Sequence, residues 1–196
     1  GANGYLGQGI VTSILNYGHE VIATGIETNY VDDRAEKINC DLFSIENPYE
    51  FFGKPDILLH LAWRDGFVHY SDTHIEDLPK HYLFIKKMIE GGVKHVAGMG
   101  SMHEIGFFEG SINENTPCNP VTPYGISKNA LREATAMLCK KNGEVIILLV
   151  IQNEVVRFFQ KLQLRLIKVR KIFLLQWDKI NMILLIMVIF VLKLQQ

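Results

Sequence analysis

Apolar positions in the first three quarters of the chain follow two patterns, one typical of helices and one typical of buried strands. Residues 8–15 place apolar side chains on one helix face, and residues 83–90 are also predicted to be helical. Residues 18–25 form a turn into a buried strand, whereas 56–62 and 93–98 are short apolar runs typical of parallel strands. Strands alternating with helices predict an α/β fold with a doubly wound parallel sheet, which binds ligands at the carboxyl ends of its strands.

A glycine run opens the chain, because Gly1-Ala2-Asn3-Gly4-Tyr5-Leu6-Gly7 has the spacing GxxGxxG and precedes the first predicted helix. Such a turn lets backbone N–H groups approach a pyrophosphate, and the helix N-terminus adds a favourable dipole. A tight loop without a ligand is the alternative. A glycine loop of this kind should follow a strand, yet nothing precedes Gly1. We therefore expect a truncated Rossmann-like sheet that lacks its first, central strand and is weakened by the loss.

Charge and cysteine content narrow the function classes. The formal net charge of −1 argues against a nucleic-acid-binding surface. Cys40, Cys118 and Cys139 are far apart and lack metal-ligand spacing, so we interpret them as free thiols of a reducing cytosol and predict no metal site. These observations predict a cytoplasmic enzyme or binding protein that acts on a small molecule.

One phenol and one ammonium are spaced for joint chemistry. Tyr124 and Lys128 lie one helical turn apart in Tyr-Gly-Ile-Ser-Lys, so both can face one bound cofactor. A phenol with a pKa of ~10 is a poor base at neutral pH, and a nearby ammonium is expected to lower that pKa. Ser101 follows the strand candidate at 93–98 and adds a hydroxyl. Taken singly, these residues could be a packing aromatic, a solvated lysine and a turn serine.

Several motifs in fixed order resemble the extended short-chain dehydrogenase/reductase family, which includes the NAD-dependent epimerases and dehydratases of nucleotide sugars. The motifs are the glycine run, Asp41-Leu42, His60-Leu61-Ala62, Gly100-Ser101, and a Pro-rich segment from Glu114 through Pro123-Tyr124 and Lys128 to Glu133. The resemblance covers residues 1–143 and implies an NAD(P)-binding Rossmann domain there. It further implies that Tyr124 is the acid/base, Lys128 its activator and Ser101 the hydroxyl that polarises the substrate oxygen.

The resemblance also implies a set of cofactor contacts. The residues concerned are Gly1, Asn3, Gly4, Tyr5, Leu6, Gly7, Asp41, Leu42, Leu61, Ala62, Trp63, Tyr124 and Lys128. Gly25 stands where NAD-preferring members carry an acid; Glu27 could substitute for it, while Arg34 could attract the 2′-phosphate of NADP. The choice between NAD and NADP stays open, with NAD favoured.

Two further positions depart from the family pattern. Trp63 replaces a small residue and could narrow the pocket, and Asp77 stands near the place of a lysine-supporting asparagine. His103, beside Ser101, is interpreted as a rim residue rather than a catalyst. Neither departure excludes activity.

The composition changes abruptly after Gly143. Residues 144–196 contain no Gly, Ala, Ser, Thr, Pro, Tyr, His or Cys, and carry eight Lys or Arg against three Asp or Glu. Codons compatible with residues 144–150, 172–179 and 182–190 yield family-like strings when they are read in a shifted frame. We therefore interpret 144–196 as a non-native, frameshifted translation of the substrate domain.

Two alternatives for this hydrophobic and basic tail are a membrane anchor and an amphipathic surface helix. Its apolar run at 182–192 is shorter than the ~20 residues a bilayer requires, so we expect no membrane association. As an unselected segment the tail would be disordered or prone to aggregate.

The resemblance therefore implies an enzyme that acts on a nucleotide-linked sugar through transient hydride transfer to NAD(P), in a parent protein that is expected to form a homodimer. The chain itself is expected to be an inactive fragment. A reductase of the same fold and a non-catalytic dinucleotide-binding protein are the alternatives.

Overall fold

The computed structural model describes residues 1–110, 112, 115–142, 146–150, 171–175 and 189–190. Its helices are α1 (Tyr5–Asn16), α2 (Pro48–Phe51), α3 (Thr73–Gly91) and α4 (Pro123–Asn142), with short 3₁₀ turns η1 (Leu42–Ser44) and η2 (Met102–Glu104). Its strands are β1 (Glu20–Gly25), β2 (Glu36–Asn39), β3 (Ile57–His60), β4 (His95–Met99), β5 (Ile146–Val150), β6 (Lys171–Leu175) and β7 (Ile189–Phe190). The predicted helices and strands of the first 143 residues are all present. Most lie within a few residues of their expected bounds, but α3 begins ten residues before the helix expected at 83–90.

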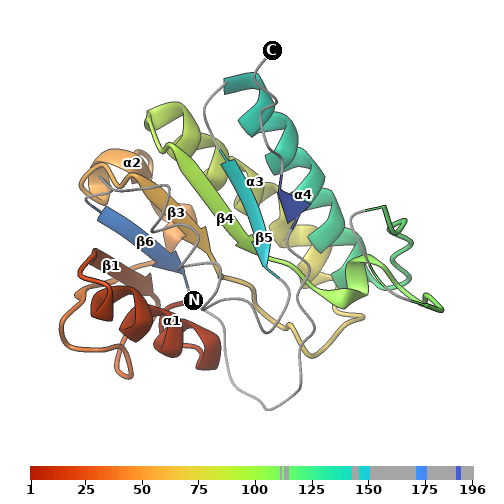
Figure 1. Cartoon of the computed structure of the whole chain (residues 1–196), viewed down its shortest axis with the longest axis horizontal. Helices are drawn as coiled ribbons and strands as arrows, with labels where there is room; N and C mark the ends of the chain where they lie inside the picture. The colour runs from red at the N-terminus through yellow and green to blue at the C-terminus, as the bar shows by residue number, and fades with distance from the viewer. Residues whose placement is uncertain (111, 113–114, 143–145, 151–170, 176–188, 191–196) are drawn as a thin grey trace.

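The strands form a single sheet in the order β2-β1-β6-β3-β4-β5-β7 (Figure 1). Every pairing is parallel except that of β7 with β5. The order of the strands from the first 143 residues reverses direction between β1 and β3, which is the switch point where doubly wound sheets bind ligands. The predicted α/β parallel sheet is confirmed.

The sheet position between β1 and β3, which we expected to be vacant, is occupied by β6. Residues 171–174 pair in parallel with residues 20–23 of β1, and Phe173 also lies in register with Leu58 of β3. A gap there would leave the backbone N–H and C=O groups of two buried strands without partners, which costs free energy. The described part of the tail thus enters the sheet, and β5 supplies the strand after β4.

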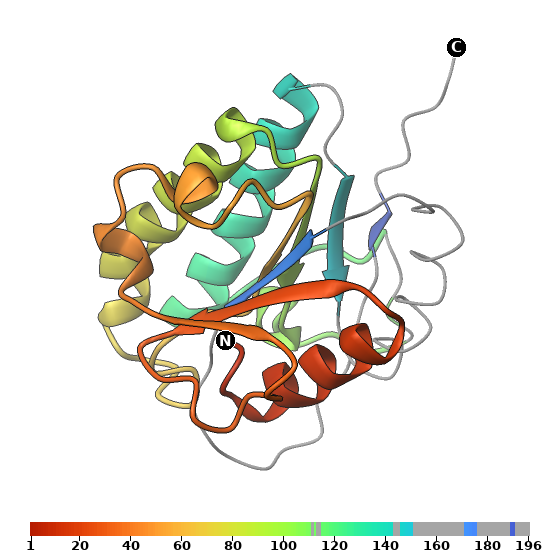
Figure 2. The same ribbon diagram turned by 90° about the vertical axis from the view of Figure 1, so that its left-hand side faces the viewer.

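Helices cover both faces of the sheet, with α2, α3 and α4 on one face and α1 on the other (Figure 2). Successive side chains along each strand point to opposite faces of the sheet, so they contribute to two separate cores. Val21 and Ala23 of β1 pack with Ile10, Val11 and Ile14 of α1, whereas the intervening Ile22 joins the opposite core.

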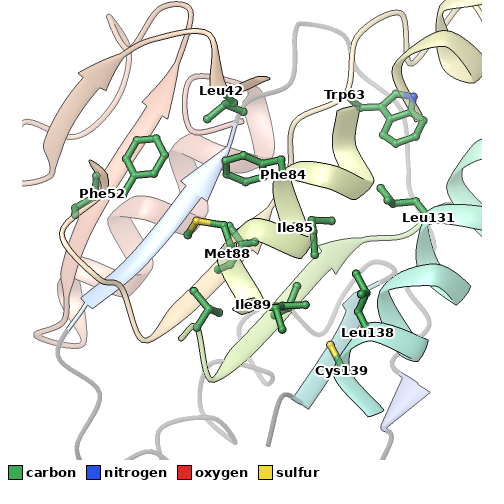
Figure 3. Packing of buried hydrophobic residues seen from close by; sticks show 14 of the residues in the cluster. Leu42, Phe52, Trp63, Phe84, Ile85, Met88, Ile89, Leu131, Leu138 and Cys139 are labelled. Atoms are coloured by element: carbon green, nitrogen blue, oxygen red, sulfur yellow. The ribbon is translucent and has the colours of Figure 1, made fainter. Parts of the chain in front are cut away.

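The larger core lies under α3 and α4 (Figure 3). Phe84, Ile85 and Met88 of α3 pack there against Phe52 and Leu58. Trp63 and Tyr124 belong to the same core, so the candidate site grows directly out of the packed interior. Among the described residues no helix is both long and apolar enough to span a bilayer.

Candidate active site

The glycine run forms a tight turn into α1. A side chain at position 7 would collide with the carbonyl oxygen of Gly1 and lie 2.8 Å from that of Ala2, so only glycine fits there. The Gly4 N–H donates to the Gly1 carbonyl at 3.2 Å, and no side chain caps the first turn of α1. The N–H groups at this helix start therefore suit an anionic group.

Two other residues of the run, Asn3 and Leu6, have structural partners. Asn3 Oδ1 accepts from the Tyr30 N–H at 2.7 Å, which ties the run to the loop after β1. Leu6 packs against the core that contains Leu61, whereas the Tyr5 side chain is exposed. Leu61 is thus a buried core residue between β3 and the site.

A cavity of about 770 Å³ opens at the carboxyl ends of β1, β2 and β3. It brings together four of the predicted cofactor residues, Asp41, Leu42, Ala62 and Trp63. The remaining lining residues are Gly25, Ile26, Glu27, Cys40, Phe43, Arg64, Asp65, Gly66, Phe67, Val68, Asp77, Lys80 and His81. The glycine run and the trio of Ser101, Tyr124 and Lys128 lie outside this lining.

Asp41 and Leu42 stand at the start of η1. The Asp41 carboxylate accepts from the Phe43 N–H at 3.0 Å and caps this turn, while Leu42 is buried in the larger core. Asp41 is exposed and retains lone pairs for a further donor. Its position fits both the turn interpretation and contact with a ligand in the cavity.

The three predicted catalytic residues meet between β4 and α4. Ser101 ends the loop after β4, and Tyr124 and Lys128 lie on the first turns of α4. All three are buried, and the side chains of Tyr124 and Ser101 are hydrogen-bonded. The Tyr124 N–H donates to the His69 carbonyl at 3.1 Å, which fixes the start of α4 against the loop that follows Trp63.

The pKa of Tyr124 is raised to about 12, mainly because burial disfavours the phenolate. The hydrogen bond with Ser101 acts in the opposite direction, and the charge of Glu104 adds to the rise. We expected the neighbouring ammonium to lower this pKa; the pKa is instead raised in the free protein, because burial is its largest influence and Lys128 is not among the groups that shift it. Tyr124 is therefore a protonated phenol at neutral pH.

Lys128 is buried with few partners. Its Nζ donates to the Met99 carbonyl at 3.0 Å and lies 4.2 Å from the centroid of the Trp63 ring. Burial lowers its pKa to about 8, while the charge of Glu104 acts to raise it. Lys128 thus keeps its proton near neutral pH, over the face of an aromatic ring that favours a cation.

Trp63 links the cavity to this trio. Its indole lines the cavity, stacks on His81 at 4.6 Å and lies edge-on to Tyr124 at 6.1 Å. Its Nε1–H donates to His74 Nδ1 at 3.0 Å, and His74 Nε2 lies 3.0 Å from the Val68 carbonyl. His74 must therefore carry its proton on Nε2. The large side chain that departs from the family pattern is held rigidly beside Lys128.

Sequence reasoning missed a cluster of histidines around these aromatics. The His69 ring lies 4.0 Å from the His103 ring and stacks on Tyr124 at 5.3 Å. His60 Nε2 lies 2.9 Å from His81 Nδ1, and burial lowers the pKa of both rings, that of His81 to about 3. Spacing along the chain gave no signal, because these histidines come from different elements. Among the described residues no group of three or more His, Cys, Asp or Glu could hold a metal.

Asp77 does not contact Lys128, although it stands near the place of the family's asparagine. Its carboxylate pairs with Arg64 and with Lys80, the latter at 2.7 Å. The hydrogen bonds and charges of these cations overcome desolvation and lower the Asp77 pKa. Asp77 therefore organises the charged wall of the cavity.

Comparison with known proteins agrees with this geometry. The family model described as the NAD dependent epimerase/dehydratase family matches residues 1–161, so the match continues past the composition change at Gly143. The chain is 44% identical over 139 residues to a dTDP-6-deoxy-L-talose 4-dehydrogenase (NAD(+)) of Aggregatibacter actinomycetemcomitans. That alignment covers 68% of this chain and 52% of the relative, so the chain spans about half the length of the curated relative it matches.

Solved structures share the fold at lower identity. A UDP-glucose 4-epimerase from Thermotoga maritima, solved with UDP-glucose, has a TM-score of 0.67 at 18% identity and covers 76% of this chain and 52% of its own. MoeE5, solved with UDP-glucose and NAD, has a TM-score of 0.63 at 25% identity, and the match covers 75% of this chain and 50% of the MoeE5 chain. With the glycine turn, the cavity at the switch point and the extent of the family match, the chain belongs to the NAD dependent epimerase/dehydratase family.

Proposed function

We propose that this chain is the cofactor-binding and catalytic half of an NAD-dependent oxidoreductase that acts on a nucleotide-linked sugar. The observation that carries the proposal is the meeting of Ser101, Tyr124 and Lys128 beside Trp63, which also lines the cavity at the carboxyl ends of the strands. A phenol, a hydroxyl and an ammonium at one buried point can bind a sugar oxygen and move its proton.

The residues of the chain fit a bound dinucleotide. The turn that excludes a side chain at Gly7 would hold the pyrophosphate, and Asp41 and Leu42 would hold the adenine end in the cavity. The other predicted contacts, Asn3, Tyr5, Leu6, Leu61 and Ala62, remain predictions. NAD, when bound, accepts a hydride from the carbinol carbon and can return it.

The chain's own residues would then manage the proton. Ser101 orients the sugar oxygen, and Tyr124 exchanges a proton with it as the hydride moves. Because Tyr124 is protonated in the free protein, it is ready to act as the acid toward a ketone. To act as the base toward an alcohol, Tyr124 must first lose its proton. The positive charge of Lys128 would favour the resulting phenolate.

Two charged residues support NAD over NADP. Glu27 lines the cavity, where a carboxylate can accept from ribose hydroxyls and repels a 2′-phosphate. Arg34 is engaged by Asp32 at 2.7 Å and is absent from the lining. Among the lining residues that the structure describes, no cation at the end of β1 is therefore free to bind a 2′-phosphate.

The 44% identical relative supports a nucleotide-linked 6-deoxyhexose as the substrate and oxidation at its C4 position as the reaction. Epimerisation or dehydration would begin with the same hydride transfer, so they are the alternatives. A non-catalytic dinucleotide-binding protein is disfavoured by the intact Ser101, Tyr124 and Lys128. The parent protein would be a cytoplasmic homodimer.

The tail from 144 to 196 is proposed to be a frameshifted translation of the substrate domain, following the domain that ends at 143. Its composition supports this, although β5 and β6 show that parts of it complete the sheet. Sequencing the gene tests it: an open shifted frame encoding a glycine- and proline-containing domain is expected. Early stop codons in that frame would refute it.

The activity itself is tested in the repaired full-length protein, the complete product of the gene read in the shifted frame after residue 143. Tyr124→Phe should lower turnover of a dTDP-6-deoxyhexose with NAD by at least about 100-fold, as loss of an acid/base does. Unchanged turnover would sink the enzyme proposal, and retained NAD binding would leave the dinucleotide-binding module. The 196-residue chain should show no turnover.

A further inference from the structure

Glu104 is a buried carboxylate that the proposed mechanism does not use. It ends η2, only 4% of its surface is exposed, and burial raises its pKa. Buried carboxylates are rare unless they are paired, so the partners of Glu104 must compensate for its loss of water.

Each oxygen of Glu104 is committed to a different element. Oε1 accepts from the Ser101 backbone N–H at 2.7 Å, and the Ser101 Oγ in turn accepts from the His103 N–H at 3.3 Å. This reciprocal arrangement is a capping box that closes η2. Oε2 accepts from Arg132 Nε on α4 at 3.1 Å. One carboxylate therefore joins the loop that carries Ser101 to the helix that carries Tyr124 and Lys128.

Arg132 is itself held in place. Its Nη2 donates to Cys118 Sγ at 3.2 Å and also to Asn129 Oδ1. Its side chain is 19% exposed, whereas the second carboxylate within reach, Glu133, is 64% exposed at 3.4 Å. The buried partner is thus the stronger one, because solvent screens the exposed pair.

The surroundings of Lys128 offer no other carboxylate with a resolved effect on it, within the part of the chain that the structure describes. Met99 from β4 provides a carbonyl, Trp63 from the loop after β3 provides an aromatic face, and Tyr124 from α4 is a neutral phenol. His60 of β3 and His81 of α3 feel the lysine charge and are held neutral by burial. Glu104 is the group whose charge favours the ammonium.

We propose that Glu104, clamped by Arg132, is a positioning residue that fixes Ser101 relative to α4 and supplies the counter-charge of the Lys128 ammonium. The catalytic meaning of this role rests on the function proposed above, but the role itself can be measured on the free chain. The Glu104 carboxylate is hydrogen-bonded to the Ser101 backbone and to Arg132. It therefore acts on Tyr124 through the placement of Ser101, and on Lys128 through its charge, which favours the ammonium.

The test follows two signals of the 196-residue chain by NMR, without cofactor or substrate. The Trp63 indole reports the titration of Lys128, because the ammonium lies over its ring; a Trp177→Phe background isolates its signal, and Lys128→Met identifies the lysine component. In the parent this component should titrate near pH 8. Glu104→Gln, which keeps the shape of the side chain and removes its charge, should lower that midpoint by about one pH unit.

Glu133→Gln is the matched control, because it removes a carboxylate from the same arginine at an exposed position. It should leave the midpoint where it was. A Glu104→Gln midpoint within about 0.3 units of the parent overturns the counter-charge role, since a nearby opposite charge shifts a pKa by about one unit or more.

The clamp is tested separately through the Ser101 amide, whose proton points at Glu104. Its chemical shift should follow the Glu104 titration, and Arg132→Gln should move that titration to higher pH, because Arg132 lowers the Glu104 pKa. This variant also decides the matter if Glu104→Gln fails to fold. An unmoved Ser101 titration overturns the clamp. If the repaired protein proved to have no enzyme activity, both NMR measurements would still be valid. The role proposed for Glu104 and the proposed function can therefore fail independently.

Discussion

Lys128, a residue of the proposed active site, opposes the stability of the fold. It sits in the core beside Trp63 with a backbone carbonyl as its hydrogen-bond acceptor, and burial depresses its pKa to about 8. The unfolded chain binds the proton up to the ordinary lysine pKa near ~10.4, so the charged lysine destabilises the fold below about pH 8. A residue chosen only for packing would be apolar at this position.

Lys128→Met should therefore stabilise the protein. At about pH 7 the free energy of unfolding should rise by up to about 3 kcal/mol, the equivalent of the pKa shift, less the lost hydrogen bond to Met99. Between about pH 8 and pH 10 the stability of the parent should increase relative to the variant, because the folded chain has released the proton that the unfolded chain still binds. Denaturant unfolding across this range measures both effects. A variant less stable than the parent at neutral pH would contradict the assigned environment.

The individual residues of the site differ in how well the sequence predicted them. Tyr124 and Lys128 were predicted from their spacing of one helical turn, and Ser101 from the order of the motifs in the family resemblance. The structure brings the three together. The role of Glu104 and the clustering of the histidines were not predicted, because their partners lie on other elements and no spacing along the chain marks them. The direction of the Tyr124 pKa shift was wrong, since burial is a property of the packed core.

At the scale of elements, the tight turn at the start of α1 depends on the absence of a side chain at Gly7. Gly7 and Gly9 are two residues apart on the same helix, yet a side chain at Gly7 meets backbone oxygens and one at Gly9 meets nothing within 4 Å. The two glycines are chemically identical and differ only in what surrounds them. They therefore form a matched pair for mutation.

Gly7→Ala should destabilise the fold by about 1–3 kcal/mol, because the colliding atoms belong to the backbone and cannot rotate away. Gly9→Ala should stabilise it by up to about 1 kcal/mol, since it lies exposed within a helix. Chemical denaturation of both variants gives the two values. Equal effects of both substitutions would rule out the close approach in the turn.

The elements themselves were predicted well where a continuous apolar run or a helix-start motif marks them. The apolar runs at 56–62 and 93–98 became β3 and β4, and the helix after Pro123 extends to Asn142. The short helix α2 was not anticipated, because its four residues are too few to show a period. The role of Trp63 as a wall shared by the cavity and Lys128 also lay beyond the sequence, since it depends on how the loop after β3 meets α4.

The whole molecule is organised around a sheet whose centre comes from the far end of the chain. Strand β6 lies between β1 and β3 (Figure 1). The glycine run that leads into α1 begins beside this position. The composition of the tail predicted a segment outside the fold; the sheet instead recruits short apolar stretches of it. Unpaired central strands provide the physical reason, because their backbone groups need partners that only another strand can supply.

Leu174→Pro tests this arrangement. Proline removes one backbone donor from the centre of the sheet, where Leu174 lies in register with Ala23 and Leu59. The free energy of unfolding should fall by at least about 2 kcal/mol, while Leu174→Val, which keeps the strand, should change it far less. If the proline variant unfolds at the same denaturant concentration as the parent, β6 does not complete the sheet.

The central claim, that this chain forms the NAD-binding site of its family, is tested most directly by calorimetric titration of NAD into the folded 196-residue protein. The parent and Gly9→Ala should both bind NAD saturably, and Gly7→Ala should bind at least about tenfold more weakly, a loss of about 1.4 kcal/mol. Circular dichroism at the titration temperature confirms that each variant is folded. A folded parent that binds no NAD, or a folded Gly7→Ala variant that binds it as tightly as Gly9→Ala, would contradict the account.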